Sequence, residues 1–549
     1  MIDDSRLHQS NWKWLGLIFF LLAAFLYLGV SGDPDLGYHL ATGEYIVKSR
    51  VVPQVDLFSF SLPNYPYVYH SWLTEVLLYL SYSRAGLWGV SIFYSLLAGG
   101  AFYFLACIIR WRLNNKALVF SLLVFVPLIA SILGLRTHLI TFWGLSFLYY
   151  AFERRMNSAI THEPEGHCCH SGIPHVVSHK VVDEWPTVQG STIDSNKGAL
   201  FPLRKLVFLP PLFVLWANLH GGFILGLGFL GLLLSWEIYQ IWISSKGRNL
   251  KIKFTLARTV LMGFCLAAPL ITPYGWHTYE QALRMGLNSF AAQYNFDWLP
   301  LFDSLSVFPT LGVFVSILFL LTVFTNRKTA PKEKFLTTIF FFLTLKSRRY
   351  ILGFLIITIP LLIQQIELFV AKFKRRDFWT NFPWYLALFT ASLLFVENRL
   401  IILSRMEQAY ASEEIFAREA LPADPYPYAA VLWMKENGVP KNLLNNFTWG
   451  GYLIWKLPEH KFFIDGRMDN FFIDDKSFAQ DYQEIVMLKP KWNELMKKYQ
   501  INAVLGPPKW ALMQALRMQE EWEIVVENES SVMMWYRKAV SEEGVSDKY

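Results

Sequence analysis

Two carboxylates flank a proline early in the chain, in the run Gly32-Asp33-Pro34-Asp35. Pro34 has a fixed φ and no backbone N–H, so a helix cannot continue through the pair, and both acids are expected on a turn. A carboxylate fixed there can take a proton from an attacking nucleophile. A pair of carboxylates also offers the hard oxygen ligands that Mg²⁺ or Mn²⁺ prefers. Asp33 and Asp35 are therefore the candidate catalytic residues, and Mg²⁺ or Mn²⁺ is the candidate cofactor.

Basic side chains stand at the ends of other apolar runs. The candidate phosphate-binding residues among them are Arg136, His138, His220, Arg348 and Arg349. Guanidinium and imidazole groups suit a phosphate and can stabilise the charge of a leaving group. Taken singly, each is more often a solvated loop end; together they put basic groups on one face of an apolar bundle. His39, close to Asp35, and Asp297, in a later polar loop, are further candidate metal ligands.

Composition places these groups at the edge of a membrane domain. Hydrophobic residues make up 54% of the 549 residues and charged residues 17%, against about 25% in an ordinary soluble domain. Residues 404–549 hold 39 of the 93 charged residues, with a net charge of −5, whereas residues 1–403 carry a net charge of +12. The sequence therefore predicts a polytopic α-helical membrane domain over 1–403 and a soluble α/β domain over 404–549.

The basic residues of the first part fall in short runs between apolar spans, which argues against nucleic-acid binding and gives a topology. Eleven candidate spans cover about 15–30, 86–109, 117–135, 138–152, 206–217, 221–243, 254–272, 306–325, 335–346, 350–370 and 384–403. With a cytoplasmic N-terminus, every Lys/Arg-rich loop lies in the cytoplasm, as the positive-inside rule requires. This predicts a multi-pass plasma (inner) membrane protein. The loop 31–83, the candidate site residues and the C-terminal domain are then extracytoplasmic.

The predicted cytoplasmic insert 153–204 contains histidines and cysteines between 162 and 179. The adjacent pair Cys168-Cys169 does not make a CxxC metal knuckle, and Gly, Pro and Ser surround it. We therefore interpret this stretch as a disordered polar insert rather than a soft-metal site. The four cysteines of the chain give no disulfide framework.

The last 146 residues alternate short apolar runs with helical stretches. The pattern predicts helices at 429–437, 489–499 and 508–518, strands at 442–446, 451–455, 461–465 and 502–505, and a hairpin of 523–527 with 532–537. Two loops after expected strands carry Trp449 with Tyr452, and Asp465 with Arg467. Ligands bind at such loops in α/β folds, although a packing role for Trp449 and a turn at Asp465-Gly466 remain the alternative.

The arrangement resembles the GT-C class of membrane glycosyltransferases, and within it the catalytic subunit of oligosaccharyltransferases and related bacterial polyprenyl-phosphate-sugar-dependent transferases. Asp35 with Tyr38-His39-Leu40 is similar to the Asp-containing motif that follows the first helix in that family. The resemblance implies the catalytic-carboxylate role for Asp35. It also implies contacts with metal and lipid phosphate for Asp297, Arg348 and Arg349.

The segments 446–452 and 463–466 are similar to the region around the WWDYG motif of the same family. The resemblance implies acceptor binding by Trp449, Tyr452, Asp465 and Arg467. The acidic residue of that motif, which helps to read the acceptor sequon, is a glycine in Thr448-Trp449-Gly450-Gly451-Tyr452. The acceptor is therefore left open between a lipid, a polysaccharide and a protein.

These features together predict an integral-membrane glycosyltransferase that moves a sugar or glycan from a polyprenyl-phosphate or polyprenyl-diphosphate donor to an acceptor on the outer face. The first alternative is a transporter or flippase of lipid-linked sugars, which would have polar groups at mid-bilayer and a repeat between halves. The second is a non-catalytic surface-binding protein that uses the C-terminal domain alone. Eleven spans are a larger anchor than that role needs.

Overall fold

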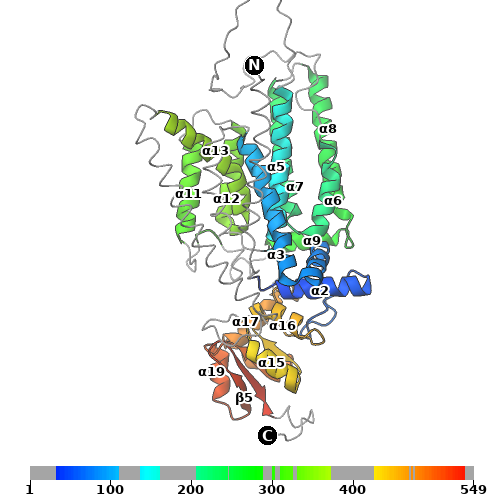
Figure 1. The fold of residues 1–549 in the computed structure, drawn as a ribbon, viewed down its shortest axis with the longest axis vertical. Helices are drawn as coiled ribbons and strands as arrows, with labels where there is room; N and C mark the ends of the chain where they lie inside the picture. The colour runs from blue at the N-terminus through cyan, green and yellow to red at the C-terminus, as the bar shows by residue number, and fades with distance from the viewer. Residues whose placement is uncertain are drawn as a thin grey trace, which may run out of the picture.

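The computed structural model describes residues 33–110, 136–160, 206–244, 247–287, 300–302, 309–324, 331–372, 426–468, 471–473 and 476–537. Long helices form a bundle, and residues 426–537, here called the tail, form a smaller unit at one end of it (Figure 1). Helix α2 (Leu36–Ser49) lies across the boundary between the two. Its position puts the turn before α2 between the bundle and the tail.

The predicted spans that fall within the described residues all correspond to helices. These are α3 (Trp72–Arg110), α5 (His138–Ile160), α6 (Leu209–Leu219), α7 (Phe223–Ser244), α8 (Arg248–Ala267), α11 (Pro309–Phe324), α12 (Pro331–Lys346) and α13 (Ile351–Lys372). Helix α9 (His277–Leu287) was not predicted. Three stretches in this part of the chain are long and apolar enough to cross a membrane: Trp72–Ile109, Phe223–Ile243 and Arg248–Leu270. Spans 15–30, 117–135 and 384–403 lie outside the described residues, so the total of eleven, the topology and the domain limits stay predictions.

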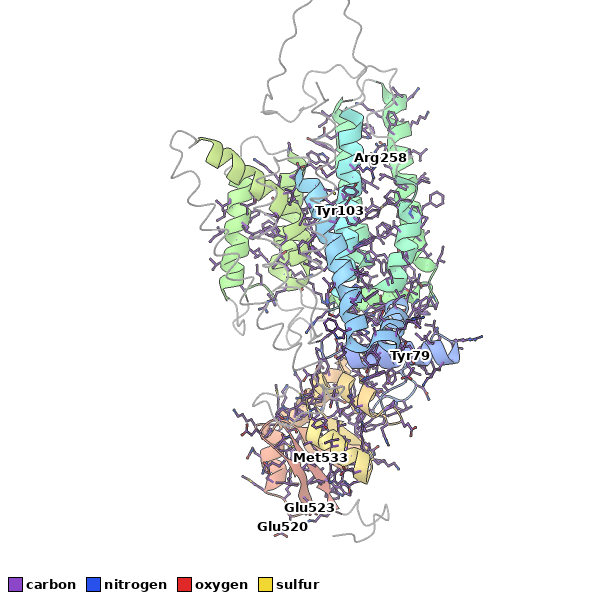
Figure 2. The ribbon with its side chains drawn as sticks, in the orientation of Figure 1. Tyr79, Tyr103, Arg258, Glu520, Glu523 and Met533 are labelled. Carbon is purple, nitrogen blue, oxygen red and sulfur yellow. The ribbon has the colours of Figure 1, made fainter. Side chains whose placement is uncertain are left out.

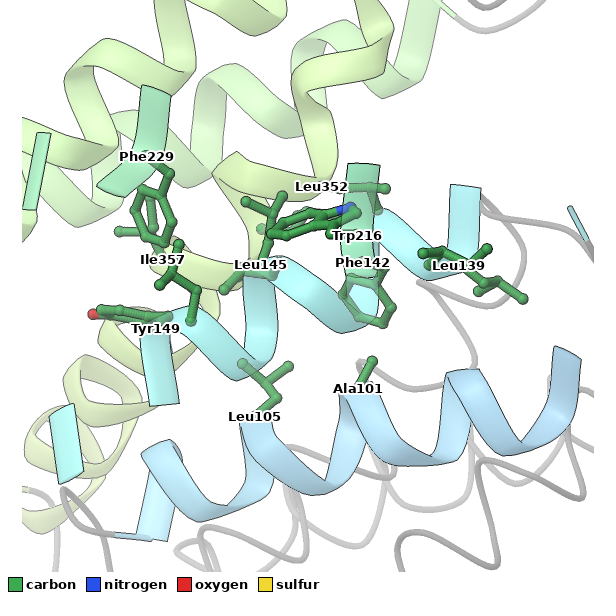
Figure 3. Packing of buried hydrophobic residues seen from close by; sticks show 14 of the residues in the cluster. Ala101, Leu105, Leu139, Phe142, Leu145, Tyr149, Trp216, Phe229, Leu352 and Ile357 are labelled. Carbon is green, nitrogen blue, oxygen red and sulfur yellow. The ribbon is translucent and has the colours of Figure 1, made fainter. Parts of the chain in front are cut away.

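The bundle is held together by close packing of buried side chains. Figure 3 shows Ala101 and Leu105 of α3 facing Phe142, Leu145 and Tyr149 of α5. Helices in lipid gain no hydrophobic driving force from meeting one another, so such interdigitation supplies much of their association.

A buried ionic cluster ties three helices together inside the bundle. Glu237 of α7 pairs with Arg155 of α5 and with Arg258 of α8, whose Nε lies 2.9 Å from Glu237 Oε2. Figure 2 places Arg258 toward the end of the bundle that is far from the tail. The cluster is therefore separate from the acidic turn at the other end.

The tail is a small α/β unit, as predicted. Its elements are α15 (Tyr428–Asn437), β1 (Leu443–Asn445), α16 (Gly450–Lys456), β2 (Phe472–Ile473), β3 (Lys476–Ser477), α17 (Phe478–Val486), α18 (Trp492–Lys498), β4 (Ala503–Gly506), α19 (Ala511–Arg517), β5 (Trp522–Glu527) and β6 (Val532–Tyr536). The larger sheet has the order β1-β4-β6-β5. Strands β1 and β4 are parallel, and β6 is antiparallel to both of its neighbours.

Two of the predicted strands in the tail are wrong. Residues 451–455 belong to helix α16, because a short apolar run of this length fits a buried helix as well as a strand. Residues 461–465 are extended but form no ladder within the tail. The side-chain oxygen of Asn445 accepts from Phe463 N at 3.0 Å, and its amide donates to Ile464 O at 2.8 Å, so a buried side chain takes the bonds of a neighbouring strand.

The tail is docked onto the loop 50–71, which connects α2 and α3. Phe462 N donates to Phe58 O at 2.9 Å, and Phe60 N donates to Phe462 O at 3.2 Å. The Ser61 hydroxyl donates to Phe463 O at 2.6 Å. Tyr67 and Tyr69 of this loop belong to the same hydrophobic cluster as the tail helices. The tail therefore shares its core with a segment nearly 400 residues earlier in the chain.

Glycines allow the two backbones to touch where α2 meets α16. A Cβ on Gly37 would lie under 3.0 Å from the carbonyl of Gly451, and a Cβ on Gly451 would lie under 3.0 Å from the carbonyl of Pro34. Real side chains do not reach such distances, so each position requires glycine unless the backbones separate. This contact sets how closely the tail approaches the acidic turn.

Gly451→Ala should destabilise the protein by about 1–3 kcal/mol, because the added methyl group has to separate two packed backbones. The measurement is the thermal unfolding midpoint of the detergent-solubilised chain. Gly263→Ala in α8, where a Cβ meets nothing within 4 Å, is the matched control and should leave the midpoint unchanged or slightly raised. Equal midpoints for the two variants would contradict the packed contact.

Candidate active site

The acidic turn (Asp33, Pro34 and Asp35) has the form that the sequence predicts. The chain turns at Pro34 and Asp35, and α2 begins at Leu36. Asp33 is buried; its Oδ1 accepts a hydrogen bond from Asp35 N at 3.2 Å and lies 3.6 Å from Arg136 Nε. Asp33 therefore fixes the turn and brings the predicted phosphate-binding Arg136 next to the two acids.

Asp35 is partly exposed and faces the tail. Its carboxylate contacts Gly466, whose added Cβ would meet Asp35 Oδ1 under 3.0 Å. Burial, together with the charge of Asp33, raises the pKa of Asp35 to about 7, while His39 and Arg136 oppose that rise. A general base works best when its pKa lies near the operating pH. Asp35 thus has the protonation behaviour of a base at neutral pH.

His39 and Glu75 form a buried pair beside the turn. His39 Nδ1 lies 3.0 Å from Glu75 Oε1. Burial alone would lower the pKa of His39, but the hydrogen bond and the charge of Glu75 outweigh it and raise that pKa. Since Glu75 occupies Nδ1, His39 has only Nε2 to offer a metal ion.

The described residues do not by themselves complete the predicted metal site. Among them, no three His, Cys, Asp or Glu side chains converge closely enough to hold an ion. The predicted ligand Asp297 lies outside the described residues. The Mg²⁺ or Mn²⁺ site at Asp35, His39 and Asp297 therefore stays a prediction.

Three histidines gather where the ends of α5 and α6 meet the loop before α3. The ring of His220 lies 5.6 Å from that of His138 and 6.1 Å from that of His70, centre to centre. His220 Nδ1 accepts from Gly222 N at 3.0 Å and lies 2.8 Å from Thr141 Oγ1. Because a backbone N–H can only donate, Nδ1 is unprotonated and the proton of a neutral His220 ring is on Nε2. We call these three residues the histidine cluster.

The surroundings keep His70 and His220 uncharged at neutral pH. Burial comes first, and nearby histidines and Arg349 add to it; together they lower the pKa of His70 to about 4 and hold that of His220 well below its usual value. Neutral imidazoles can still donate N–H bonds to an anion, and a bound phosphate would compensate the positive charges. The cluster therefore suits a phosphate group.

The α6–α7 turn that carries His220 is pinned to the start of α3. Trp72 Nε1 donates to Asn218 Oδ1 at 2.8 Å, and the Thr74 hydroxyl donates to Leu219 O at 2.5 Å. The amide of Asn218 in turn donates to Ile271 O at 3.0 Å. These bonds fix the position of the turn relative to two other segments, the start of α3 and the chain at Ile271.

Arg348 and Arg349 lie on a short 3₁₀ turn, Arg348–Tyr350, between α12 and α13. The charge of Arg349 acts on both His70 and His220, so this arginine belongs with the histidine cluster. Arg348 is buried on the same turn. The charge of His39 contributes to the pKa shifts of Asp35, His70 and His220.

Arg467 is the centre of a buried network that joins the tail to loop 50–71. Its Nη2 lies 2.8 Å from Asp56 and 2.6 Å from Asp465, and its Nε donates to Asp465 at 2.8 Å. The guanidinium also lies within 5.9 Å of five aromatic rings, those of Tyr38, Phe58, Tyr67, Tyr69 and Phe471. Burial would raise the pKa of Asp56, but Arg467 and hydrogen bonds from Ser59 and Phe58 lower it.

All four predicted acceptor-binding residues are buried. Trp449 and Tyr452 pack in one hydrophobic cluster with Tyr38 of α2. Asp465 and Arg467 are engaged in the buried network with Asp56. Their acceptor-binding role is not tested by these contacts and stays a prediction.

Glu75, which pairs with His39, and His70, next to His220, also belong to the site. In the sequence they are two polar residues near the start of a helix, and nothing there distinguishes them from solvated groups. Tyr94 was missed altogether. It is fully buried on α3, and its side chain interacts electrostatically with Asp33 and Asp35. From the sequence alone, a tyrosine in an apolar span cannot be distinguished from one that only packs in the core. Only the three-dimensional proximity to the acidic turn identifies it.

By sequence, no family model and no curated protein matches the chain. By structure, it is similar to the oligosaccharyltransferase of Archaeoglobus fulgidus in the apo form. That likeness has a TM-score of 0.53 at 12% identity and covers 90% of this chain and 70% of that one. AglB from the same archaeon, in complex with an inhibitory peptide and a dolichol-phosphate, is similar with a TM-score of 0.49 at 11% identity, over 90% and 69% of the two chains.

The likeness to the apo enzyme shows the fold, which is that of the Archaeoglobus fulgidus oligosaccharyltransferase. The family resemblance predicted from the acidic turn and the tail motifs is thereby confirmed at the level of the fold.

Arg467→Met should destabilise the protein by about 3–5 kcal/mol, because it leaves the carboxylates of Asp56 and Asp465 buried without their cation. Arg517→Met is the matched control in the tail, since Arg517 pairs with Glu527 at the surface and such pairs contribute at most about 1 kcal/mol. The measurement is thermal unfolding of both purified variants. Similar losses of stability would contradict a special role for the Arg467 network.

His70→Gln should make the stability of the protein less sensitive to acid. In the folded chain the pKa of His70 is about 4, below the 6.5 of an unfolded histidine, so the unfolded state binds more protons between these values. The histidine's contribution to stability is thus lost as pH falls from 6.5 toward 4, at a rate of at most about 1.4 kcal/mol per pH unit. Unfolding midpoints of both proteins across pH 4.5–7.5 measure the difference. Parallel curves would show that His70 is not buried in its neutral form.

Proposed function

We propose that the chain is an integral-membrane glycosyltransferase. It moves a sugar or glycan from a polyprenyl-phosphate or polyprenyl-diphosphate donor to an acceptor on the face of the membrane that carries the tail. The observation that supports this most directly is the acidic turn itself, with Arg136 Nε 3.6 Å from Asp33 and the buried His39–Glu75 pair beside it, next to helices long enough to cross a membrane. The fold shared with an oligosaccharyltransferase supports the same class of chemistry.

The two parts of the donor, its lipid chain and its phosphate-linked sugar, would bind to different parts of the protein. Its polyprenyl chain stays in the bilayer beside the bundle, and its phosphate reaches the end of the bundle, where Arg349 and the histidine cluster gather. Arg136, held by Asp33, adds a cation close to Asp35. The sugar carbon bonded to the phosphate then lies between the basic groups and the carboxylate.

The reaction then follows from the charges. The acceptor oxygen or nitrogen attacks the anomeric carbon and forms a new bond to it, while the bond from that carbon to the phosphate oxygen breaks. Asp35 takes the proton that the acceptor loses. The electron pair of the broken bond leaves on the phosphate, whose charge Arg349 and the imidazole N–H groups stabilise. Asp33 contributes by raising the pKa of Asp35.

The acceptor class remains a lipid, a polysaccharide or a protein. Gly451 and Gly466 of the tail face the acidic turn, and Gly450 faces the tail backbone at Ile464 and Asp465. The segment 448–452 contains no acidic residue. Recognition of an acceptor through a carboxylate of that segment is therefore not part of the proposal. Asp35 is proposed as the base or, in the alternative, as a ligand that would hold a Mg²⁺ or Mn²⁺ cofactor together with Asp297 and His39 Nε2. The proposed location is the plasma (inner) membrane, with a cytoplasmic N-terminus and an extracytoplasmic tail.

A transporter or flippase of lipid-linked sugars is the alternative. It would use the phosphate-binding groups but would have no need of a carboxylate with a pKa near neutrality. The raised pKa of Asp35 and its place beside the basic groups favour transfer.

Asp35→Asn should lower the turnover number by roughly 10²–10⁴-fold, because the amide cannot accept the proton of the acceptor. The assay uses undecaprenyl-phosphate and undecaprenyl-diphosphate carrying radiolabelled sugars, with a total membrane extract as the source of acceptors. Glu523→Gln is the control, since this exposed acid lies at the far end of the tail (Figure 2) and should not affect transfer. Full transfer by the Asp35 variant would remove the carboxylate from the mechanism. Lipid flipping by the wild-type chain without any transfer would favour the transporter.

A further inference from the structure

The Asp35 carboxylate rests on a single backbone position of the tail. The place that a side chain would take at Gly466 is filled by the Asp35 side chain: a Cβ there would meet Oδ1, with Cγ at 3.0 Å and Oδ2 at 3.4 Å. All three nearest atoms to that Cβ position belong to Asp35. The first atoms that a methyl group at Gly466 would meet are therefore those of the carboxylate.

The segment that carries Gly466 is fixed on both sides. Asp465 Oδ1 accepts from Arg467 N at 3.0 Å and from Arg467 Nε at 2.8 Å, which closes a tight turn around the glycine. Arg467 is held at the same time by Asp56 of loop 50–71, at 2.8 Å. Gly466 thus lies between two residues that are buried and joined to each other by charge-assisted bonds, which are the stronger kind.

The backbone of Asp35 is fixed from the other side. Its N–H donates to Asp33 Oδ1, and Gly451 packs on Pro34 with a Cβ position 3.6 Å from Asp35 Cα. Neither the turn nor the segment 465–467 can move away without breaking these contacts. A methyl group added at Gly466 would therefore act on the softest element between them, which is the Asp35 side chain.

We propose that Gly466 is a positioning residue for the Asp35 carboxylate, and that the tail thereby forms part of the catalytic unit instead of serving only to recruit an acceptor. This inference rests on the proposed function, since it assigns Gly466 to the reaction that Asp35 carries out. Gly466 acts through Asp35 alone. Because Gly466 has no side chain, the Asp35 carboxylate can pack directly against the fixed segment 465–467.

The position of the carboxylate matters because proton transfer requires hydrogen-bond geometry at the reacting atom. A misplacement of about 1 Å can cost on the order of 10²-fold in rate. In the proposed function the donor phosphate is bound by other groups: Arg349, His138 and His220 from the bundle, and His70 from loop 50–71. Loss of the glycine should thus lower the turnover number and leave the Michaelis constant for the donor unchanged.

The test combines kinetics with a double-mutant cycle on the full-length chain. Gly466→Ala should lower kcat by about 10²-fold or more at unchanged donor KM, measured with the polyprenyl-linked sugar on which the wild-type chain is active. Gly228→Ala in α7, where a Cβ meets nothing within 4 Å, is the matched control and should retain wild-type kinetics.

The cycle measures the contact independently of activity. Gly466→Ala should lower the unfolding midpoint of the wild-type chain, but it should have little effect in the Asp35→Ala background, because the place of the methyl group is then vacant. Equal losses in both backgrounds would overturn the contact. A normal kcat for folded Gly466→Ala, or a rise in KM with no fall in kcat, would overturn the positioning role.

The two proposals fail differently. If the wild-type chain transfers sugar and Gly466→Ala transfers it equally well, only the role of Gly466 is lost. If the wild-type chain transfers no sugar from any of the labelled donors, the proposed function is lost, and the positioning role goes with it.

Discussion

The contact of two backbones at Gly37 and Gly451 is the constraint on which the rest of the site depends. Any side chain at either position would hold α2 and α16 apart. With glycine there, the tail approaches closely enough for Gly466 to meet Asp35 and for Arg467 to reach Asp56. The buried ionic network then keeps the two parts in register, and the shared hydrophobic core of loop 50–71 and the tail adds to their association. The acidic turn is thus enclosed by residues from both ends of the chain.

The acidic and basic groups around this turn come from different parts of the protein. The carboxylates of Asp33 and Asp35 come from the turn before α2, and the tail adds Asp465, which is already compensated by Arg467. The bundle supplies Arg136, Arg349, His138 and His220, and loop 50–71 adds His70. A phosphate that approaches from the bundle meets cations and N–H donors, and an acceptor that approaches from the tail side meets a carboxylate with a raised pKa. This division is what a transfer between two substrates at a membrane surface needs.

The sequence predicted those parts of the structure that local chemistry decides. Pro34 forces the turn and places both acids on it, and the apolar periodicity gives the helices of the bundle. The wrong strand at 451–455 shows where a short apolar run is ambiguous. Residues 461–465 do not form the predicted strand, because the Asn445 side chain makes the backbone hydrogen bonds that a neighbouring strand would otherwise make. The role of Arg467 could not be predicted, because its partner Asp56 is distant in sequence and a lone arginine on a loop resembles a binding residue. Nor does a sequence show which glycines are required by a close approach of two backbones.

The most direct test of the account is a cryo-EM map of the full chain with a bound polyprenyl-phosphonate sugar, a donor analogue whose sugar cannot leave. The account predicts that the phosphonate contacts Arg349 and His220 and that the anomeric carbon faces the carboxylate of Asp35. A headgroup bound elsewhere on the bundle, with Asp35 out of reach of the sugar, would contradict it.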